Sequence, residues 1–507
     1  MLNYLCSLTI LFPLLGVLGL GLSPLFSNSK SVPWIKWIGL VSSILSSLCA
    51  FALLAQFNKG ATLFQGLESL SWVDSYSIAY AVGLDGLNAP LVLLIAVIFP
   101  ILIGAEWKQP SGRMGMQALF LLLQATLIGV VTAQNLFLVC FFWLLSALPF
   151  YFLFIIWGDE AREKAGFRFF VTASAGSALF FVVLILIYYS VDPNSFSIKE
   201  LFGGKFWKGE VSMLGLDMPV SRLAFLLFAL SFMLRIPIWP IHGWFTYAMT
   251  QAPASVAIAF GGVFVPVALY LFTKLGYLIF PMEMSHFQPW ILAIGEVGFI
   301  FSAILCVAQR ELRMVFAYLC MNQIGLSLVG IASGGSAGVV GSLYHEFAFG
   351  LALSGFGLFF GLLRERTEKT SFLGDDGQPH FGGVVRHSPV LTLTVSLILG
   401  ALLCVPGLGG FVGQSLILIG GFGVSVFSVL VIGASFVVLV YGLFQVFMKI
   451  FLGHERGESK RVFDLTWREK LCFTPIVGLL IVFGVYPKPL LDVIRPSVAQ
   501  LLAALSA

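Results

Sequence analysis

Six ionisable side chains lie within or beside long apolar stretches of the sequence. They are Arg235, His242, Lys274, Glu296, His345 and Glu346. A charge is expensive to bury in an apolar stretch, so residues of this kind are retained for a reason. A buried lysine, histidine or carboxylate that binds and releases a proton is a building block of a proton-transfer path. The alternative is a structural ion pair, or a group close to the membrane surface.

Two pairings within this set are suggested by the sequence. Glu296, in the segment I-G-E-V-G, is a candidate partner for a buried cation such as Arg235 or Lys274. His345 and Glu346 are adjacent and could together form a short proton relay.

Motifs for other kinds of chemistry are missing from the sequence. The seven cysteines are scattered singly without C-x-x-C spacing, which predicts free buried thiols rather than a metal site or a disulfide framework. We find no haem-binding C-x-x-C-H, no P-loop and no G-x-G-x-x-G after a strand. The chain is therefore predicted to have no catalytic site, cofactor site or metal site of its own.

The composition predicts that lipid surrounds these residues. Apolar residues make up 59% of the 507 residues, charged residues 10%, and the mean hydropathy is +0.99. Soluble domains carry about 25% charged residues, so a soluble protein is excluded. We expect an all-α polytopic membrane protein.

Runs of about 20 apolar residues, the length that crosses a bilayer, predict the membrane spans. Fourteen such helices are expected, followed by an interfacial helical tail at 490–507. They lie near 4–26, 33–57, 87–105, 114–133, 135–157, 169–190, 222–248, 252–280, 288–308, 313–332, 338–363, 388–422, 424–452 and 471–487. The first run lacks a basic leader and a cleavage site, so we interpret it as a retained helix rather than a signal peptide.

The positions of the basic residues predict the orientation of the spans. Loops after odd-numbered helices hold nineteen lysines and arginines, and loops after even-numbered helices with the tail hold seven. Because cytoplasmic loops are enriched in basic residues, the odd loops are predicted to be cytoplasmic and both termini to lie on the other side.

Two of the predicted helices contain breaks. The seventh includes R-I-P-I-W-P-I-H with Pro237 and Pro240, and the twelfth includes V-P-G-L-G-G from Val405 to Gly410. Proline interrupts a helix, and interrupted helices in equivalent places are typical of transporters built from inverted repeats. We therefore predict one membrane domain over 1–507, with helices 1–3 at about 4–105, five-helix repeats at about 114–280 and 288–452, and a last helix and tail at about 471–507. The alternative is that these residues only shape packing.

Six motifs in register resemble one known family over roughly residues 80–420. They are G-L-D-G-L (83–87), P-I-W-P-I-H-G-W (237–244), Q-A-P (251–253), A-Q-R-E-L-R-M-V-F-A-Y (308–318), E-R-T (365–367) and V-P-G-L-G-G-F-V-G-Q (405–414). The chain thereby resembles the M-type antiporter-like subunits of respiratory complex I, the NADH-quinone oxidoreductase. Cation/proton antiporters and membrane-bound hydrogenases share the same core.

The resemblance implies a part in coupling electron transfer to proton translocation. Members carry protons through buried lysine, glutamate and histidine residues joined by water. NADH, flavin, iron–sulfur clusters and quinone are expected only in partner subunits. The expected partners are other membrane-arm subunits on both flanks, and lipid, with no nucleic acid. The expected location is an energy-transducing membrane, such as a bacterial inner membrane.

The sequence departs from the family at the residues that carry protons. The positions of the family's ionisable groups are occupied by Leu144, Arg235, Pro266, Gln323, Phe349 and Gln414, and two further carboxylates by Gln124 and Gln251. Glutamine cannot be ionised, and arginine does not release its proton. The residues His242 and Lys274 do align with family positions, the latter in place of an arginine.

Three functional hypotheses follow. The first is a membrane-arm subunit that keeps the architecture, has lost the proton path and serves a structural or transmitting role. The second is an active translocator with a path rerouted through Glu296, His345 and Glu346. The third is a subunit of a cation/proton antiporter or hydrogenase complex.

Overall fold

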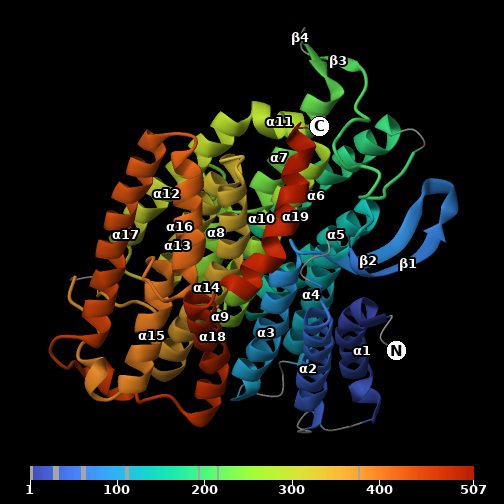
Figure 1. Cartoon of the computed structure of the whole chain (residues 1–507). Coiled ribbons are helices and arrows are strands. Elements are labelled where there is room, and N and C mark those ends of the chain that lie inside the picture. Colours follow the sequence, from blue (N-terminus) through green and yellow to red (C-terminus); the bar gives the residue numbers. More distant parts are fainter. Residues whose placement is uncertain are drawn as a thin grey trace.

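The apolar runs form helices because a helix satisfies its own backbone hydrogen bonds where no water is present. A computed structural model of the chain describes residues 4–26, 34–58, 64–108, 114–191, 194–213, 216–374 and 377–506. The helices pack side by side, with α17 at one edge and α1, α2 and a β-hairpin toward the other (Figure 1).

The helices of the first half and the middle of the chain follow the predicted order closely. They are α1 (Leu5–Phe26), α2 (Trp34–Ala55), α3 (Ala89–Ala105), α4 (Met114–Thr132), α5 (Leu136–Trp157), α6 (Arg162–Ser190), α7 (Val220–Arg235), α8 (Gly243–Gln251), α9 (Ala254–Ala257), the π-helix η5 (Ile258–Phe264), α10 (Val265–Ile279) and α11 (Pro281–His286).

The second half continues in the same manner. Its helices are α12 (Gln288–Ala308), α13 (Leu312–Ala332), α14 (Ser336–Thr367), α15 (Pro389–Leu402), α16 (Gly409–Phe422), α17 (Val426–Phe451), α18 (Trp467–Val485) and α19 (Lys488–Ser506). Both predicted breaks are present: α7 ends at Arg235 before α8 begins at Gly243, and α15 ends at Leu402 before α16 begins at Gly409.

The many-span helical membrane fold is confirmed, whereas the count of fourteen spans stays a prediction. In the described part of the chain, ten helices are long and apolar enough to cross a membrane, or up to eleven if the bent pair α18 and α19 is one span. The remaining predicted spans correspond to the shorter α3, to α7 with α8, and to α15 with α16. Lys30, Lys59 and Arg113, which contributed to the charge asymmetry, lie outside the described residues.

Two small antiparallel hairpins were not predicted. Strand β1 (Gln65–Val73) pairs with β2 (Ile78–Leu84) between α2 and α3, and β3 (Glu210–Met213) pairs with β4 (Leu216–Pro219) before α7. Both occupy connections between predicted spans. They form locally because each returns on itself within a few residues.

The centre of the bundle consists of η5 with α10, α13 and α14, which are almost completely buried. Proline at position 266 lacks a backbone N–H, and the helix is widened to the π form immediately before it. This places glycines against neighbouring backbone: a Cβ at Gly262 would lie 3.1 Å from the carbonyl oxygen of Gly350 on α14. The central helices are therefore in close contact at this level.

The C-terminal segment, predicted as an interfacial tail, forms α19, which bends by 72° from α18. It packs along α10, α11 and α14, with Ile494 and Val498 fully buried. The Ser497 hydroxyl accepts a hydrogen bond of 3.2 Å from the Gly86 N–H, so α19 also contacts the start of α3. The segment is part of the packed bundle.

Candidate functional site

The broken helix α7 ends in a buried arginine. The side chain of Arg235 is 1% exposed and lies between α5, α6 and the π-helix. Its guanidinium donates hydrogen bonds to the Trp143 carbonyl oxygen at 2.9 Å, the Ser177 hydroxyl at 2.8 Å and the Ser146 hydroxyl at 2.9 Å. It stacks 4.2 Å from the Trp143 ring.

All three acceptors of these Arg235 hydrogen bonds are uncharged groups. Its Nε atom is buried without a hydrogen-bond partner in the described part of the chain. Leu144, which the resemblance predicts to occupy the position of a family glutamate, is 41% exposed and belongs to the outer surface of α5. Because a guanidinium holds its proton at any ordinary pH, this end of α7 carries a fixed cation instead of a proton-exchanging pair.

Two glutamines form an amide pair in the second half. Gln414 on α16 donates from its amide to the Leu402 carbonyl oxygen at 3.1 Å and to the Gln323 side-chain oxygen at 3.4 Å. Gln323 on α13 donates in turn to the Asn322 side-chain oxygen at 3.0 Å. The three side chains are fully buried. They join α13, α16 and the end of α15 by hydrogen bonds that involve no titratable group.

His345 and Glu346 lie together on α14, one helical turn before the expected histidine position at Phe349. Both are fully buried. The His345 ring lies 5.2 Å from the Phe349 ring, and its backbone touches Gly413 so closely that a Cβ at Gly413 would lie 2.7 Å from the His345 Cα. Ser342 donates a weak hydrogen bond of 3.4 Å to Glu346. Both His345 nitrogens and Glu346 Oε2 lack hydrogen-bond partners among the described residues.

Lys274 forms a buried ion pair with a carboxylate that the sequence analysis did not select. Its ammonium lies 2.7 Å from Asp85 Oδ2, and the two side chains are 3% and 7% exposed. Lys274 also donates to the Tyr270 hydroxyl at 3.0 Å. The other oxygen of Asp85 accepts the backbone N–H groups of Leu87 and Asn88 at the start of α3.

The prediction that Glu296 pairs with Arg235 or Lys274 is wrong. Lys274 uses Asp85, and the described hydrogen bonds of Arg235 go to neutral groups. Glu296 lies on α12, and its Oε1 is buried without a partner in the described residues. Asp85 was available as a candidate, since it stands in the G-L-D-G-L motif directly before an apolar helix.

The other predicted positions lie apart from one another. Pro266 lies in the first turn of α10 next to the π-helix, against Gly350 of α14. His242 lies in the break before α8, with its ring 5.3 Å from that of Phe301. Gln124 on α4 accepts a hydrogen bond from Ser43 at 2.8 Å, and Gln251 accepts one from the Ala161 N–H at 3.0 Å. Pro266, Gln124 and Gln251 thus make packing contacts and neutral hydrogen bonds.

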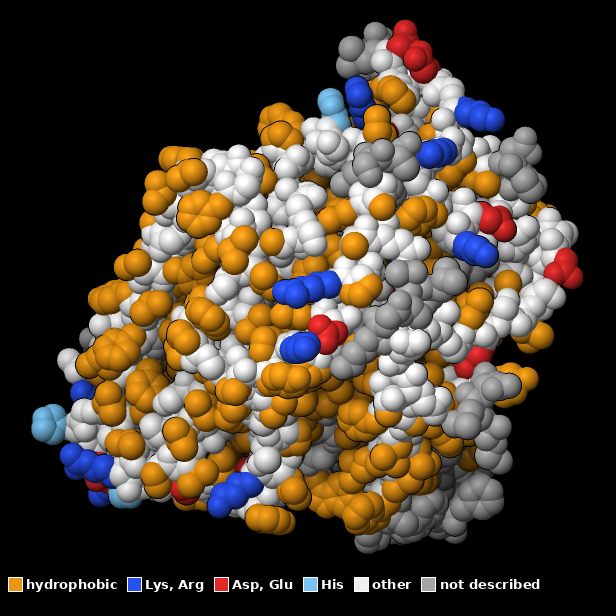
Figure 2. Space-filling model, in the orientation of Figure 1, with side chains coloured by type: hydrophobic (Ala, Val, Ile, Leu, Met, Phe, Trp, Pro, Cys, Tyr) orange, Lys and Arg blue, Asp and Glu red, His pale blue; other side chains and the backbone are white. Residues whose placement is uncertain are grey.

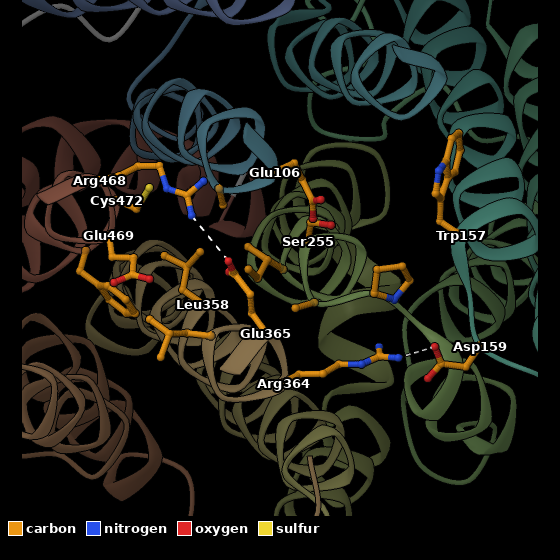
Figure 3. Close-up of a pocket in the computed structure, with 17 residues that line it drawn as sticks. Glu106, Trp157, Asp159, Ser255, Leu358, Arg364, Glu365, Arg468, Glu469 and Cys472 are labelled. Carbon is orange, nitrogen blue, oxygen red and sulfur yellow. Dashed lines mark hydrogen bonds and ion pairs between the residues drawn. The ribbon is translucent and has the colours of Figure 1, made fainter. Parts of the chain in front are cut away.

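A pocket of about 380 Å³ opens where α3, α5 and α14 end and α18 begins (Figure 3). These helix ends adjoin the loops after the third, fifth, eleventh and thirteenth predicted spans. At its edge, Asp159 accepts hydrogen bonds from Arg364 at 2.6 Å and from Arg313 at 2.7 Å. Partial burial acts to raise the pKa of the Asp159 carboxyl. The two arginines outweigh it and hold this pKa below the ordinary value of 3.8.

The Asp159→Asn variant should be less stable by about 1 kcal/mol at neutral pH, because two partly exposed charged hydrogen bonds are lost. Since the folded-state pKa is lowered, the contribution of Asp159 is complete above the ordinary value and is lost as the pH falls below it. Thermal unfolding in detergent from neutral pH to about pH 3 should show the difference from the parent chain shrinking. The exposed neighbour Glu160→Gln should show no such trend. A difference that grows toward low pH would contradict this assignment.

The fold and the buried groups together define a class: a polytopic helical membrane subunit with two interrupted helices and buried ionisable residues. The matching family model, described as NADH:quinone oxidoreductase/Mrp antiporter, TM, covers residues 133–440. The chain belongs to this family.

Relatives with assigned names point to one type of subunit within the family. The NADH-quinone oxidoreductase subunit M of Rhodobacter capsulatus is 27% identical over 470 residues, covering 92% of this chain and 90% of the relative. Subunit M of Rickettsia felis is 26% identical, covering 98% of each chain.

Solved structures share the fold over the whole chain. A chain of respiratory complex I from Thermus thermophilus with bound NADH superposes with a TM-score of 0.86 at 21% identity, covering 100% of both chains. A chain of the Mrp complex from Dietzia sp. gives 0.83 at 15% identity, with 99% of both chains covered. At these identities the likeness establishes the fold.

Proposed function

We propose that this chain is the M-type membrane-arm subunit of a complex I-type NADH-quinone oxidoreductase. We further propose that it has a structural and transmitting role in the membrane arm and does not carry protons itself. The observation that carries the second part is the Arg235 site. A guanidinium bonded to one carbonyl oxygen and two serine hydroxyls has no group to which it could pass a proton. The family's coupling of protons to electrons would then be performed by other subunits.

The second half supports the same proposal. Where the family places a histidine and a glutamate, Gln323 and Gln414 bond to each other and to neutral acceptors. An amide keeps the hydrogen-bonding shape of a carboxylic acid but does not exchange its proton at ordinary pH. The two glutamines thereby keep α13 packed against α16 without providing groups that exchange protons.

The surface fits a subunit held between neighbours in a membrane. Apolar side chains cover the flank formed by α17, and charged side chains gather mainly at the two ends of the molecule, apart from a few over α19 (Figure 2). On α5, Phe141, Leu144 and Leu148 are each about two-fifths exposed. We infer partner subunits or lipid at both faces, in an energy-transducing membrane such as a bacterial inner membrane, with both termini on the non-cytoplasmic side.

A rerouted proton path is the second candidate, and one observation favours it. His345 and Glu346 keep buried titratable atoms without partners in the described residues. On α10, which packs against α14, the Tyr270 hydroxyl accepts a hydrogen bond from Lys274, and Lys274 pairs with Asp85. These groups could pass protons from α14 toward the start of α3.

The double variant His345→Phe with Glu346→Gln, in the assembled complex, separates the two candidates. If the role is structural and transmitting, the double variant should move as many protons per electron pair as the parent complex, because neither titratable group carries protons. The measurement is proton uptake into vesicles at a known rate of NADH oxidation. Gln414→Leu is the matched control, since it removes a buried polar group that cannot titrate. A lower ratio in the double variant alone, with normal assembly, would overturn the proposal in favour of the rerouted path.

A further inference from the structure

Glu296 is an ionisable side chain near the middle of a helix that is long enough to span the membrane. It is the ninth of the 21 residues of α12, Gln288–Ala308. Trp290, near the start of the same helix, is 69% exposed, and exposed tryptophans concentrate at the level of lipid headgroups. Six residues further along the helix, Glu296 lies about 9 Å deeper, at a rise of about 1.5 Å per residue. Its carboxylate is therefore at the level of the acyl chains.

The side of α12 that carries Glu296 packs against α17. The rings of Phe299 and Phe436 are 5.2 Å apart, and a Cβ at Gly442 would lie 2.8 Å from Val307 Cγ2. Glu296 precedes Phe299 by three positions and Val307 by eleven, spacings that place residues on one side of a helix. Both contacts advance in the same direction along the two helices, so α12 and α17 run parallel. They lie beside each other at one edge of the bundle (Figure 1).

The Glu296 carboxylate has no hydrogen bond or ion pair with the residues that the structure describes. Its Oε1 is buried without a partner, whereas Oε2 is not enclosed and the side chain as a whole is partly exposed. On α17 the Ser435 hydroxyl, next to Phe436, is likewise buried without a partner and does not donate to Glu296. The one cation within the described helices α12 and α17 is Lys449, in the last turn of α17. The counter-charge of Glu296 is therefore not supplied by these two helices.

The surface next to Glu296 is apolar and open to a further helix. On α12, Ala293 is exposed and Val297 is 40% exposed. On α17, Ala434 is exposed and Val437 is 70% exposed. Small residues on a membrane helix allow the backbone of another helix to approach closely. A carboxylate beside such a surface is costly in hydrocarbon unless an oppositely charged group meets it there.

We propose that Glu296 is the docking point for a transmembrane helix of a neighbouring subunit, and that this helix carries a lysine or arginine near the middle of the membrane. The helix lies along the outer surface of α12 and α17, and its cation donates to Glu296 Oε2. The inference rests on the proposed function, because it takes the chain to be assembled in a membrane arm. It adds the chemistry that the neighbour must present at this face.

The depth and charge of Glu296 select this occupant over the alternatives. The amine of a lipid headgroup lies at the level of Trp290 and does not reach a carboxylate deeper in the membrane. A neighbouring helix with a hydroxyl or amide at this depth would donate a hydrogen bond but leave the negative charge uncompensated. A basic side chain provides both, and ionisable residues within membranes usually pair with one another.

The first test compares the isolated chain with the assembled complex. In the purified chain, Glu296→Leu and Glu296→Gln should unfold at the same temperature as the parent or higher, because no bond within the chain is lost. In membranes solubilised in mild detergent, the fraction of either variant that stays in the complex on native gels should fall about tenfold. Glu283→Gln is the matched control, since it removes a carboxylate from the short helix α11, outside the spanning helices, and should change neither quantity.

The second test identifies the partner by cross-linking. A photoreactive phenylalanine at Ala293, one turn from Glu296, should form a product with an apolar segment of a neighbouring subunit that contains a lysine or arginine. Replacing that basic residue with methionine should lower retention as much as Glu296→Gln does, and the two changes together should lower it no further. The same reagent at Phe167, an exposed residue of α6, should give a different product.

Several results would overturn the inference. They are undiminished retention of both Glu296 variants, a purified Glu296→Leu chain that unfolds earlier or fails to fold, and cross-links from Ala293 to lipid alone or to a segment without a basic residue. Failure of the proposed function is recognised separately. A parent chain that does not copurify with quinone-reducing subunits would contradict the proposed function, whereas normal copurification that is insensitive to Glu296 contradicts this inference alone.

Discussion

Replacing Lys274 with methionine should lower the free energy of unfolding by about 3–5 kcal/mol, because it leaves the Asp85 carboxylate buried without its counter-ion. The two side chains are 3% and 7% exposed and 2.7 Å apart, so water cannot replace the missing ammonium without opening the structure. The loss should also be visible in the membrane as a smaller amount of assembled complex. The measurement is thermal unfolding of the purified chain in detergent, with native gels of solubilised membranes.

A double-mutant cycle makes this prediction specific to the pair. Asp85→Asn keeps an oxygen that can accept the N–H groups of Leu87 and Asn88, so it removes the charge with little change in the start of α3. Alone it leaves Lys274 uncompensated and should also destabilise the chain. Combined with Lys274→Met it should recover part of the stability, because neither residue is then buried as an unpaired charge. Additive losses would show that the two charges do not stabilise one another.

Gly410→Ala should be nearly as damaging, for a steric reason. A Cβ at this position of α16 would lie 1.7 Å from the backbone carbonyl oxygen of Ala401 on α15. A backbone atom within a helix cannot move aside as a flexible side chain does, so the two halves of the broken helix would have to separate. We expect a loss of about 3 kcal/mol, at the upper end of overpacking effects.

Gly433→Ala is the matched control for Gly410→Ala. Gly433 lies in α17, and a Cβ there would meet no atom within 4 Å. Alanine favours a helix over glycine by about 0.5–1 kcal/mol, so this variant should be as stable as the parent chain or slightly more so. Thermal unfolding of the two variants side by side measures the difference. Equal effects would mean that the close approach of α16 to α15 is not required.

Local signals in the sequence predicted the elements well. Helix α7 ends at Arg235, shortly before Pro237 and Pro240, because proline lacks the backbone N–H that would continue the helix. Val405–Gly410 overlaps the gap between α15 and α16 for a similar reason. These effects depend on the residue itself and its near neighbours. The exact limits of each span were less predictable, since α6 begins at Arg162 whereas the predicted span begins at 169.

Contacts between segments far apart in the sequence could not be predicted from these local signals. Lys274 and Asp85 are 189 positions apart, and Arg235 bonds to residues 92, 89 and 58 positions away. Helix α5 is apolar on all sides, so no periodicity distinguishes the outward Leu144 from the inward Trp143. The motifs of the family assign the substituted positions to residues of the chain, and that assignment stays a prediction. The partner of each position follows only from the packing.

The fixed cation at the end of α7 has a consequence for the electrical insulation of the membrane. Under the proposed function the subunit spans an energised bilayer without translocating, so it must not offer protons or sodium ions a leak. A buried positive charge that cannot be discharged raises the electrostatic energy of any cation approaching it, as arginines do in pores that exclude protons. We therefore expect Arg235, held in place by Trp143, Ser146 and Ser177, to act as a barrier to cations in the first half of this subunit.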